Sequence, residues 1–318
     1  MGIDWNQPLP RDLLRPFLAR SNLAGLRMLA FNWCLVVACF ALVMWQPSIP
    51  SVVAAMLVLG GRQLGLGILM HEAAHRSLLK SAALNEWAGQ WLCAAPMFVD
   101  LGIYRRYHMT HHMQAGTDAD PDLPNYASYP VTPASLARKL ARDITGRSGL
   151  RAFAALVALY GADPDRQAQG YSYRAGAGQV QWKVLLRHSW RSLVANALMA
   201  GACALAGHPL AYLLWPASWL TTYMLYSRIR NAAEHGALPG TREADIWRNT
   251  RTVRARWWER LTVAPNYVNY HFEHHLVPTV PAHQLPRFHR WLREQGAYER
   301  AQYEPGYGQV LRRLVGAA

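Results

Sequence analysis

The first half of this chain contains a long apolar stretch without charged side chains. It runs from Met28 to Gly61 and is interrupted by the segment Pro47-Ser48-Ile49-Pro50. A helix needs about 20 apolar residues to cross the hydrocarbon core of a bilayer, so the stretch is too long for one crossing. It therefore predicts two membrane spans, over residues 28–46 and 51–70.

A second uncharged stretch, from Ser192 to Ser227, has the same organisation. Gly207-His208-Pro209 divides it, and its first half is short, so that span is expected to begin earlier. The pattern predicts two further spans, over residues 188–206 and 210–227. Two hydrophobic hairpins would then flank a polar middle of more than a hundred residues.

These hairpins predict an all-α integral membrane protein with one domain covering residues 1–318. Its four transmembrane helices would carry a helical cytoplasmic cap made of residues 71–187 and 228–318. Charged residues make up 16% of the chain, against about 25% in soluble domains. A mean hydropathy of -0.06 argues against a wholly embedded chain. A large soluble helical protein is the alternative, but uncharged runs of this length are costly in water and natural in lipid.

The basic residues indicate which side of the membrane the cap occupies. The formal net charge is +14, yet neither connection, 47–50 or 207–209, contains Lys or Arg. The positive-inside rule then predicts an inner (plasma) membrane protein with its cap and both termini in the cytoplasm. This placement accounts for the basic excess without nucleic acid as a partner.

Local features lead to further expectations. Arg62 falls inside the second span, so we expect it near the inner interface and paired with a carboxylate. One helical face, ringed by arginines, predicts a helix lying on the membrane surface. The segment 161–178 is expected to be a mobile loop, and the chain shows no signal-peptide pattern. The residues of that face are Leu285, Phe288, Trp291 and Leu292, and the expected buried thiols are Cys34, Cys39, Cys93 and Cys203.

The histidines of this chain fall into groups with helical spacing. One pair is spaced i, i+4 and two triplets are spaced i, i+3, i+4, so the imidazoles of each group can share one side of a helix. Even numbers of predicted spans separate the groups, which places them on one side of the membrane. The groups are His71 and His75; His108, His111 and His112; His271, His274 and His275; and His235, with Asn231 one turn before it.

Nine histidines exceed the needs of one metal ion. Catalytic zinc takes about three protein ligands and a water, whereas nine ligands suit two metals with four or five each. Neutral imidazole binds iron, zinc, copper and nickel, and we favour two iron ions, with Asn231 as a water-mediated tenth ligand. The other histidines are not expected to take part: His208 lies on the far side, and His188, His283 and His289 are interpreted as surface groups.

At this level of detail the sequence resembles the membrane fatty acid desaturase family, and in particular its bacterial members. The family carries HxxxH, HxxHH and HxxHH boxes in this order, matched here by residues 71–75, 108–112 and 271–275. The segments after the second box and around the third also match, as Gly116-Thr117 with Asp120-Pro121-Asp122-Leu123, Ala264-Pro265-Asn266-Tyr267-Val268-Asn269-Tyr270 and Leu276-Val277-Pro278.

The resemblance implies O2-dependent desaturation of a lipid acyl chain at a histidine-ligated di-iron centre. Electrons would come from a separate protein of the ferredoxin, rubredoxin or cytochrome b5 type with its reductase. Three residues between the histidines of the first box favour an acyl-lipid over an animal-type acyl-CoA substrate. Candidate partners of the imidazoles are Glu72, Glu234, Glu273, Asp118, Asp120 and Asp122. Candidate tunnel residues are Trp219, Tyr223, Met224 and Tyr226, and candidate anion-binding residues are Arg105, Arg106, Arg228 and Arg230.

Other reactions fit the same boxes. A lipid hydroxylase or ketolase of the same superfamily differs only in how the substrate chain lies against the metals. A zinc-dependent membrane hydrolase needs one metal with about three ligands and a water-activating carboxylate. A metal carrier needs polar groups along its spans, and the predicted spans are almost wholly apolar.

Overall fold

The first apolar stretch folds into two long helices that pack against each other. The computed structural model describes residues 3–162 and 180–316, so most of the expected loop 161–178 lies outside the described residues. Helix α2 (Asn22–Trp45) and helix α3 (Ile49–Ala74) form this pair. Ser48 starts α3 with a reciprocal capping box, which satisfies backbone N–H groups at the tight turn. By length and composition, both helices could cross a membrane.

The second apolar stretch is helical but less regular. Helix α10 (Trp182–Leu205) is followed by three short helical segments and then by helix α12 (Met224–His235). The three segments between α10 and α12 are η4 (Pro209–Leu213), α11 (Leu214–Ser218) and the π-helical segment η5 (Trp219–Tyr223). The expected spans 188–206 and 210–227 fall on these segments, and their crossing of a membrane stays a prediction.

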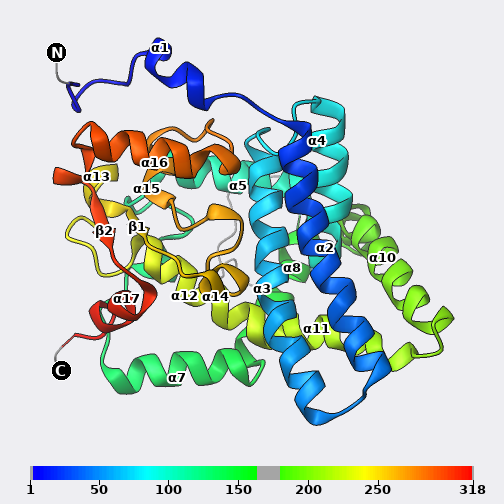
Figure 1. Cartoon of the computed structure of the whole chain (residues 1–318). Coiled ribbons are helices and arrows are strands. Elements are labelled where there is room, and N and C mark those ends of the chain that lie inside the picture. The colour runs from blue at the N-terminus through cyan, green and yellow to red at the C-terminus, as the bar shows by residue number, and fades with distance from the viewer. Residues whose placement is uncertain (1–2, 163–179, 317–318) are drawn as a thin grey trace.

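Short helices and a two-stranded sheet make up the rest of the described chain, as Figure 1 shows. Strands β1 and β2 pair in parallel, with Arg251 opposite Gln302. The remaining elements are α1 (Arg11–Leu14), η1 (Arg15–Phe17), α4 (Ala82–Ala88), η2 (Gly89–Ala94), η3 (Ala95–Met97), α5 (Leu101–Gln114), α6 (Leu123–Tyr126), α7 (Pro133–Ile144), α8 (Arg147–Tyr160), α13 (Ile246–Asn249), β1 (Arg251–Val253), α14 (Trp257–Leu261), η6 (Pro265–Tyr267), α15 (His271–Leu276), η7 (Ala282–Gln284), α16 (Leu285–Glu294), η8 (Ala297–Glu299), β2 (Gln302–Glu304) and α17 (Tyr307–Arg313).

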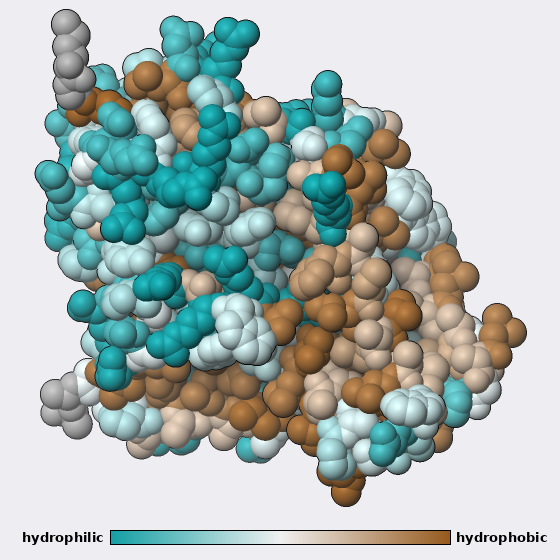
Figure 2. All heavy atoms as spheres, viewed as in Figure 1, coloured by the Kyte–Doolittle hydropathy of each residue, from teal (hydrophilic) through white to brown (hydrophobic). Residues whose placement is uncertain are grey.

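The surface divides in the same way as the sequence. Figure 2 shows hydrophobic residues gathered over α2, α3 and α10, and hydrophilic residues over the side that carries α16 and β2. Large apolar side chains such as Val37 on α2 and Leu198 on α10 are exposed. In water such a surface is unfavourable, so this side of the molecule suits contact with lipid.

Glycines let the rest of the chain approach α3 closely. A Cβ atom on Gly61 would lie 2.0 Å from the carbonyl oxygen of Leu261, and one on Gly65 would lie 2.1 Å from Asn32 Oδ1. Because neither position has room for a side chain, the segment leading to the third histidine box can rest directly on α3.

Arg62 takes part in this contact, and its partners differ from those expected. Its guanidinium donates to Asn32 Oδ1 at 3.1 Å and to the carbonyl oxygen of Arg260 at 2.9 Å. The expectation of a carboxylate partner was therefore wrong within the described chain. An amide and a backbone carbonyl also accept hydrogen bonds from a buried cation, and the side chain is 1% exposed.

Two further expectations were wrong. The apolar face of α16 packs inside the protein, where Phe288 lies 5.1 Å from Phe17 between ring centroids. An amphipathic pattern shows that a helix face is covered, but not whether lipid or protein covers it. Cys34 is exposed on α2, whereas the other three cysteines are buried and all four are free thiols.

Candidate metal centre

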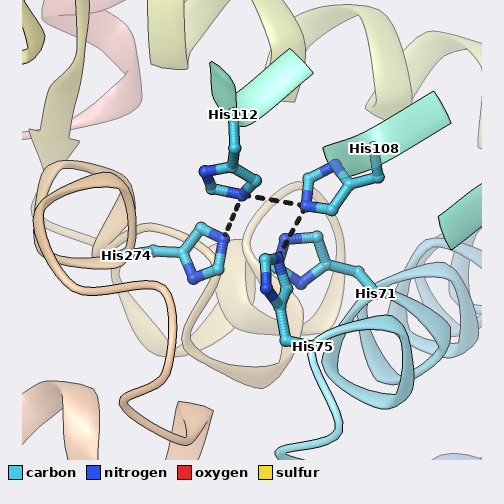
Figure 3. Close-up of side chains that lie close together, drawn as sticks. All are labelled: His71, His75, His108, His112 and His274. Atoms are coloured by element: carbon cyan, nitrogen blue, oxygen red, sulfur yellow. Dashed lines mark hydrogen bonds between the residues drawn. The ribbon is translucent and has the colours of Figure 1, made fainter. Parts of the chain in front are cut away.

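Two groups of histidines meet inside the fold. The first group consists of five residues, shown in Figure 3, which lie on α3, α5 and α15 or, for His75, directly after α3. One ring nitrogen of each lies within 4.8 Å of those of the others. The members are His71, His75, His108, His112 and His274. The sequence groups therefore converge as expected.

The second group contains four buried histidines from α5, α12 and α15. Its members are His111, His235, His271 and His275, again with ring nitrogens within 4.8 Å of one another. The groups are adjacent, because the rings of His112 and His275 lie 4.4 Å apart between centroids. The two groups thus offer five and four potential ligands, which is the number expected for two metal ions with four or five ligands each.

Each HxxHH box contributes to both groups. On α5, His108 and His112 belong to the first group and His111 to the second. On α15, His274 belongs to the first group, and His271 and His275 to the second. Residues four apart share a helix face, while the residue three positions along is rotated toward the neighbouring face. A single helical turn can thus supply ligands to two adjacent sites.

Hydrogen bonds fix the orientation of several rings. His111 Nδ1 lies 2.8 Å from Asp120 Oδ1, and this buried carboxylate also accepts from the Tyr126 hydroxyl. His235 Nδ1 donates to the carbonyl oxygen of Asn249 at 2.9 Å. Acceptors at Nδ1 leave Nε2 of each ring available to a metal, as in known metal sites.

The other candidate carboxylates divide into partners and bystanders. Glu72 and Glu234 lie 3.4 and 3.5 Å from the Nδ1 atoms of His71 and His271, respectively. Asp122 Oδ2 is 3.7 Å from His111 Nδ1. The two bystanders are Asp118, whose side chain is exposed and faces Arg242, and Glu273, which lies against His289.

The contact between Glu273 and His289 corrects the interpretation of His289 as a surface group. The residue is 8% exposed, and its Nδ1 lies 2.5 Å from Glu273 Oε1, which also accepts from the Tyr298 hydroxyl. His289 continues the i, i+3, i+4, i+7 stripe of Leu285, Phe288 and Leu292. That spacing was the signal that could have identified it as buried.

Asn249 and Arg251 are functional neighbours that motif analysis missed. Asn249 holds His235, as described above, and Arg251 donates to the carbonyl oxygens of Ala233 and Gly236 at the end of α12. Neither residue belongs to a histidine box. Their contacts use backbone carbonyl oxygens as acceptors, which every residue type has, so no sequence pattern could identify them.

Burial keeps the imidazoles in the form that binds metals. Desolvation, with the neighbouring histidines as a second cause, lowers the pKa of His274 and His275 well below the usual value. The same causes lower the pKa of His112 to about 2. For His111 burial acts in the same direction, but Asp120 and Asp122 outweigh it and raise the pKa.

The ring nitrogens converge in a way that suits a bound cation. Nε2 atoms face one another at 2.9 Å between His75 and His108 and at 2.8 Å between His235 and His271. His274 Nδ1 and His275 Nε2 are buried and make no hydrogen bond to the described residues. Buried polar atoms without partners are costly, and neutral imidazoles converging in this way suit first-row transition metals such as iron.

Comparison with known proteins identifies a family that agrees with this histidine geometry. The family model described as "Fatty acid desaturase" matches residues 47–307. This chain belongs to the fatty acid desaturase family. A similar curated protein is the dihydrorhizobitoxine desaturase of Bradyrhizobium elkanii, which is 28% identical over 260 residues, covering 80% of this chain and 69% of the relative.

In this desaturase-family fold, a cavity of about 200 Å³ adjoins both groups. His108 and His271 are among its lining residues, and so is Asn231, whose Oδ1 accepts from Arg230 Nη1 at 2.9 Å. Asn231 belongs to neither histidine group, and its water-mediated ligation stays a prediction. Of the expected tunnel residues, Tyr223 lines the cavity, whereas Trp219, Met224 and Tyr226 pack in the hydrophobic core.

Most of the arginines considered as anion-binding residues have partners within the protein. Arg105 donates to the carbonyl oxygens of Ala73 and Ala74 and to Glu86. Arg228 pairs with Asp143, and Arg230 lies 2.5 Å from Glu234. The last residue of that set, Arg106, is exposed. Arg105 and Arg228 thus hold different helices together, whereas Arg230 pairs within α12, and these internal partners reduce what the three arginines can offer an external anion.

Proposed function

We propose that this protein is an iron-dependent desaturase that uses O2 to introduce a double bond into a lipid acyl chain. The observation that carries the proposal is the pair of adjacent buried groups of five and four histidines in a chain of the fatty acid desaturase family. A hydrolase with one zinc, held by about three protein ligands, would leave about two thirds of these imidazoles without a role.

The histidine groups would hold one iron each. The reduced iron pair, when bound, supplies the activation of O2 that removing hydrogen from an unactivated methylene requires. His111 and His235 are oriented by Asp120 and Asn249, which fixes where their Nε2 atoms point. Burial of all four histidines of the second group excludes bulk water from this side of the centre.

The electron count calls for a redox partner. Loss of two hydrogens from the chain supplies two electrons, whereas reduction of O2 to two waters consumes four. The remaining two electrons, with two protons, must come from a donor, which we propose is a separate ferredoxin, rubredoxin or cytochrome b5 type protein with its reductase. The basic excess of the chain would favour an acidic partner of this kind.

A lipid substrate fits the surroundings of the site. The first group includes His71, which lies in the last turn of a helix long and apolar enough to span a bilayer. We accordingly propose an inner-membrane protein with four spans, cytoplasmic termini and a cytoplasmic metal centre. The related desaturase acts, by its name, on dihydrorhizobitoxine, so the substrate of this chain needs a direct test.

The test is to express the chain in a bacterial host together with an electron donor and its reductase. Total lipids would be compared by mass spectrometry with those of cells that carry His275→Ala. We expect lipids lighter by two hydrogens that depend on His275. Lipids heavier by one oxygen would show a hydroxylase with the same metal site, and unchanged lipids would contradict an acyl-lipid substrate.

A further inference from the structure

The cavity beside the histidine groups has two unlike walls. One wall comes from α3 and is apolar, with Leu64, Gly67 and Ile68. The part of the lining that comes from α5 and α12 contains most of the polar residues, but its charges already have partners. Arg230 pairs with Glu234. The wall of α3 is therefore the one that suits an apolar ligand.

Gly67 differs from the other glycines of this helix. A Cβ atom on Gly60 would lie 2.3 Å from Thr222 Oγ1, and Gly61 and Gly65 are equally confined, so close packing explains all three. A Cβ atom on Gly67 would meet no atom of the described residues within 4 Å. Glycine destabilises a helix interior relative to alanine, and no contact among residues 3–162 and 180–316 accounts for its presence here.

The empty space at Gly67 opens onto the cavity next to the histidines. Gly67 is the single residue between Leu59 and Ala74 that is not buried, and it is one of the residues lining the cavity. It precedes His71 by four residues, which places it one helical turn away on the same face.

We propose that Gly67 provides the room in which an apolar substrate chain lies beside the histidine groups, and that it limits how bulky that chain can be. This inference rests on the proposed function for the identity of the chain, a lipid acyl group. A larger side chain at position 67 would occupy the space of the methylenes and leave the histidines in place.

The experiment compares Gly67→Ala and Gly67→Leu with a matched control, Gly201→Leu on α10. A Cβ atom on Gly201 also meets nothing within 4 Å, but Gly201 is not among the residues lining the cavity. The full-length proteins, purified from the bacterial host, would be photolabelled with a palmitoyl phospholipid that carries a diazirine in its acyl chain. Peptide mapping by mass spectrometry would locate the label, and thermal unfolding and iron content would be measured in parallel.

We expect the wild type and Gly201→Leu to be labelled within residues 64–70 or at Tyr223. Gly67→Leu should lose label at these positions by about tenfold or more, because overpacking by a few carbon atoms typically costs that much in binding. Gly67→Ala should raise the unfolding temperature, and both Gly67 variants should retain iron.

Equal labelling of Gly67→Leu and wild type would overturn the proposal, as would a wild type labelled only elsewhere. Loss of iron in Gly67→Leu would also overturn it, since the residue would then act on the metal centre. The lipid analysis tests the proposed reaction separately: labelling that follows Gly67 without loss of two hydrogens from any host lipid would contradict the reaction and not the binding role.

Discussion

At the scale of single residues, the site depends on which ring nitrogen each histidine presents. His111 and His235 use Nδ1 to reach Asp120 and the carbonyl of Asn249, so both rings are held with Nε2 directed away from these acceptors. Burial favours the neutral form of His235 and His271 by lowering the pKa of both, whereas Asp120 and Asp122 outweigh burial at His111 and raise its pKa. A neutral, oriented imidazole can donate its lone pair to a metal without first losing a proton.

Metal content is the direct test at this scale. We expect about two irons per wild-type chain, one for each histidine group. His112→Ala or His275→Ala should lower the iron content and abolish activity, because each removes a potential ligand from a different group. Elemental analysis of purified protein measures iron and zinc together.

His208→Ala is the control for this test. The residue is exposed and precedes η4, in the connection that follows α10. Its replacement should leave both iron and activity unchanged. One zinc per chain in the wild type would exclude the di-iron interpretation, and full turnover in His275→Ala would remove that residue from the ligand set.

At the scale of elements, a buried polar network links the first two long helices to the third histidine box. Asn32 on α2 receives a hydrogen bond from Arg62 on α3 and donates to Asn266 Oδ1 at 3.1 Å. Asn266 in turn donates to the carbonyl oxygen of Gly65 at 2.8 Å. Asn266 lies five residues before His271, so the network positions the start of α15 relative to α3.

Replacing Asn32 should disturb both stability and metal binding. In Asn32→Leu, the buried guanidinium of Arg62 and the half-buried amide of Asn266 would each lose a hydrogen-bond partner, which lowers the free energy of unfolding by about 2 kcal/mol. We expect a lower unfolding temperature in detergent and a lower iron content, because the lead-in to α15 loses its attachment to α2.

Gln46→Leu is the matched control, since Gln46 is exposed and lies directly after the same helix. Its side chain is not part of the network, so iron content should be unchanged. If Asn32→Leu behaved like Gln46→Leu, the network would have no role in placing the third box.

At the scale of the whole molecule, apolar and polar surfaces lie on different sides (Figure 2). The exposed apolar side chains of α2 and α10 cannot be covered by the described chain, and contact with lipid tails would remove them from water. The histidine groups lie at the end of α3 remote from its N-terminus at Ile49, where α5, α12 and α15 contribute the other histidines.

Cysteine labelling tests the proposed orientation. In intact cells, His208→Cys should react with a membrane-impermeant maleimide, because position 208 is exposed in a connection expected outside the cytoplasm. Asp118→Cys, at an exposed position two residues before Asp120, should react only after lysis. The wild-type chain provides the blank, and the opposite pattern would invert the topology.

The histidine groups could be predicted from the sequence because they depend on the spacing of residues within single helices. Histidines at i, i+3 and i+4 must share one side of a helix, and their number exceeded the needs of one metal. The long helices over 22–45 and 49–74 could likewise be expected, since uncharged runs of that length have few other solutions. Family membership followed from the order of the boxes.

Only the tertiary structure decided which histidines belong to which group and which residues contact the buried polar side chains. Each HxxHH box divides between two sites, because neighbouring faces of one helix meet different partners from α3 and α12. Arg62 bonds to Arg260 far away in the chain, His289 lies against Glu273 of α15, and the apolar face of α16 packs against Phe17 in place of lipid. Burial and hydrogen bonding between distant segments depend on how helices pack, and no local pattern of residues records that.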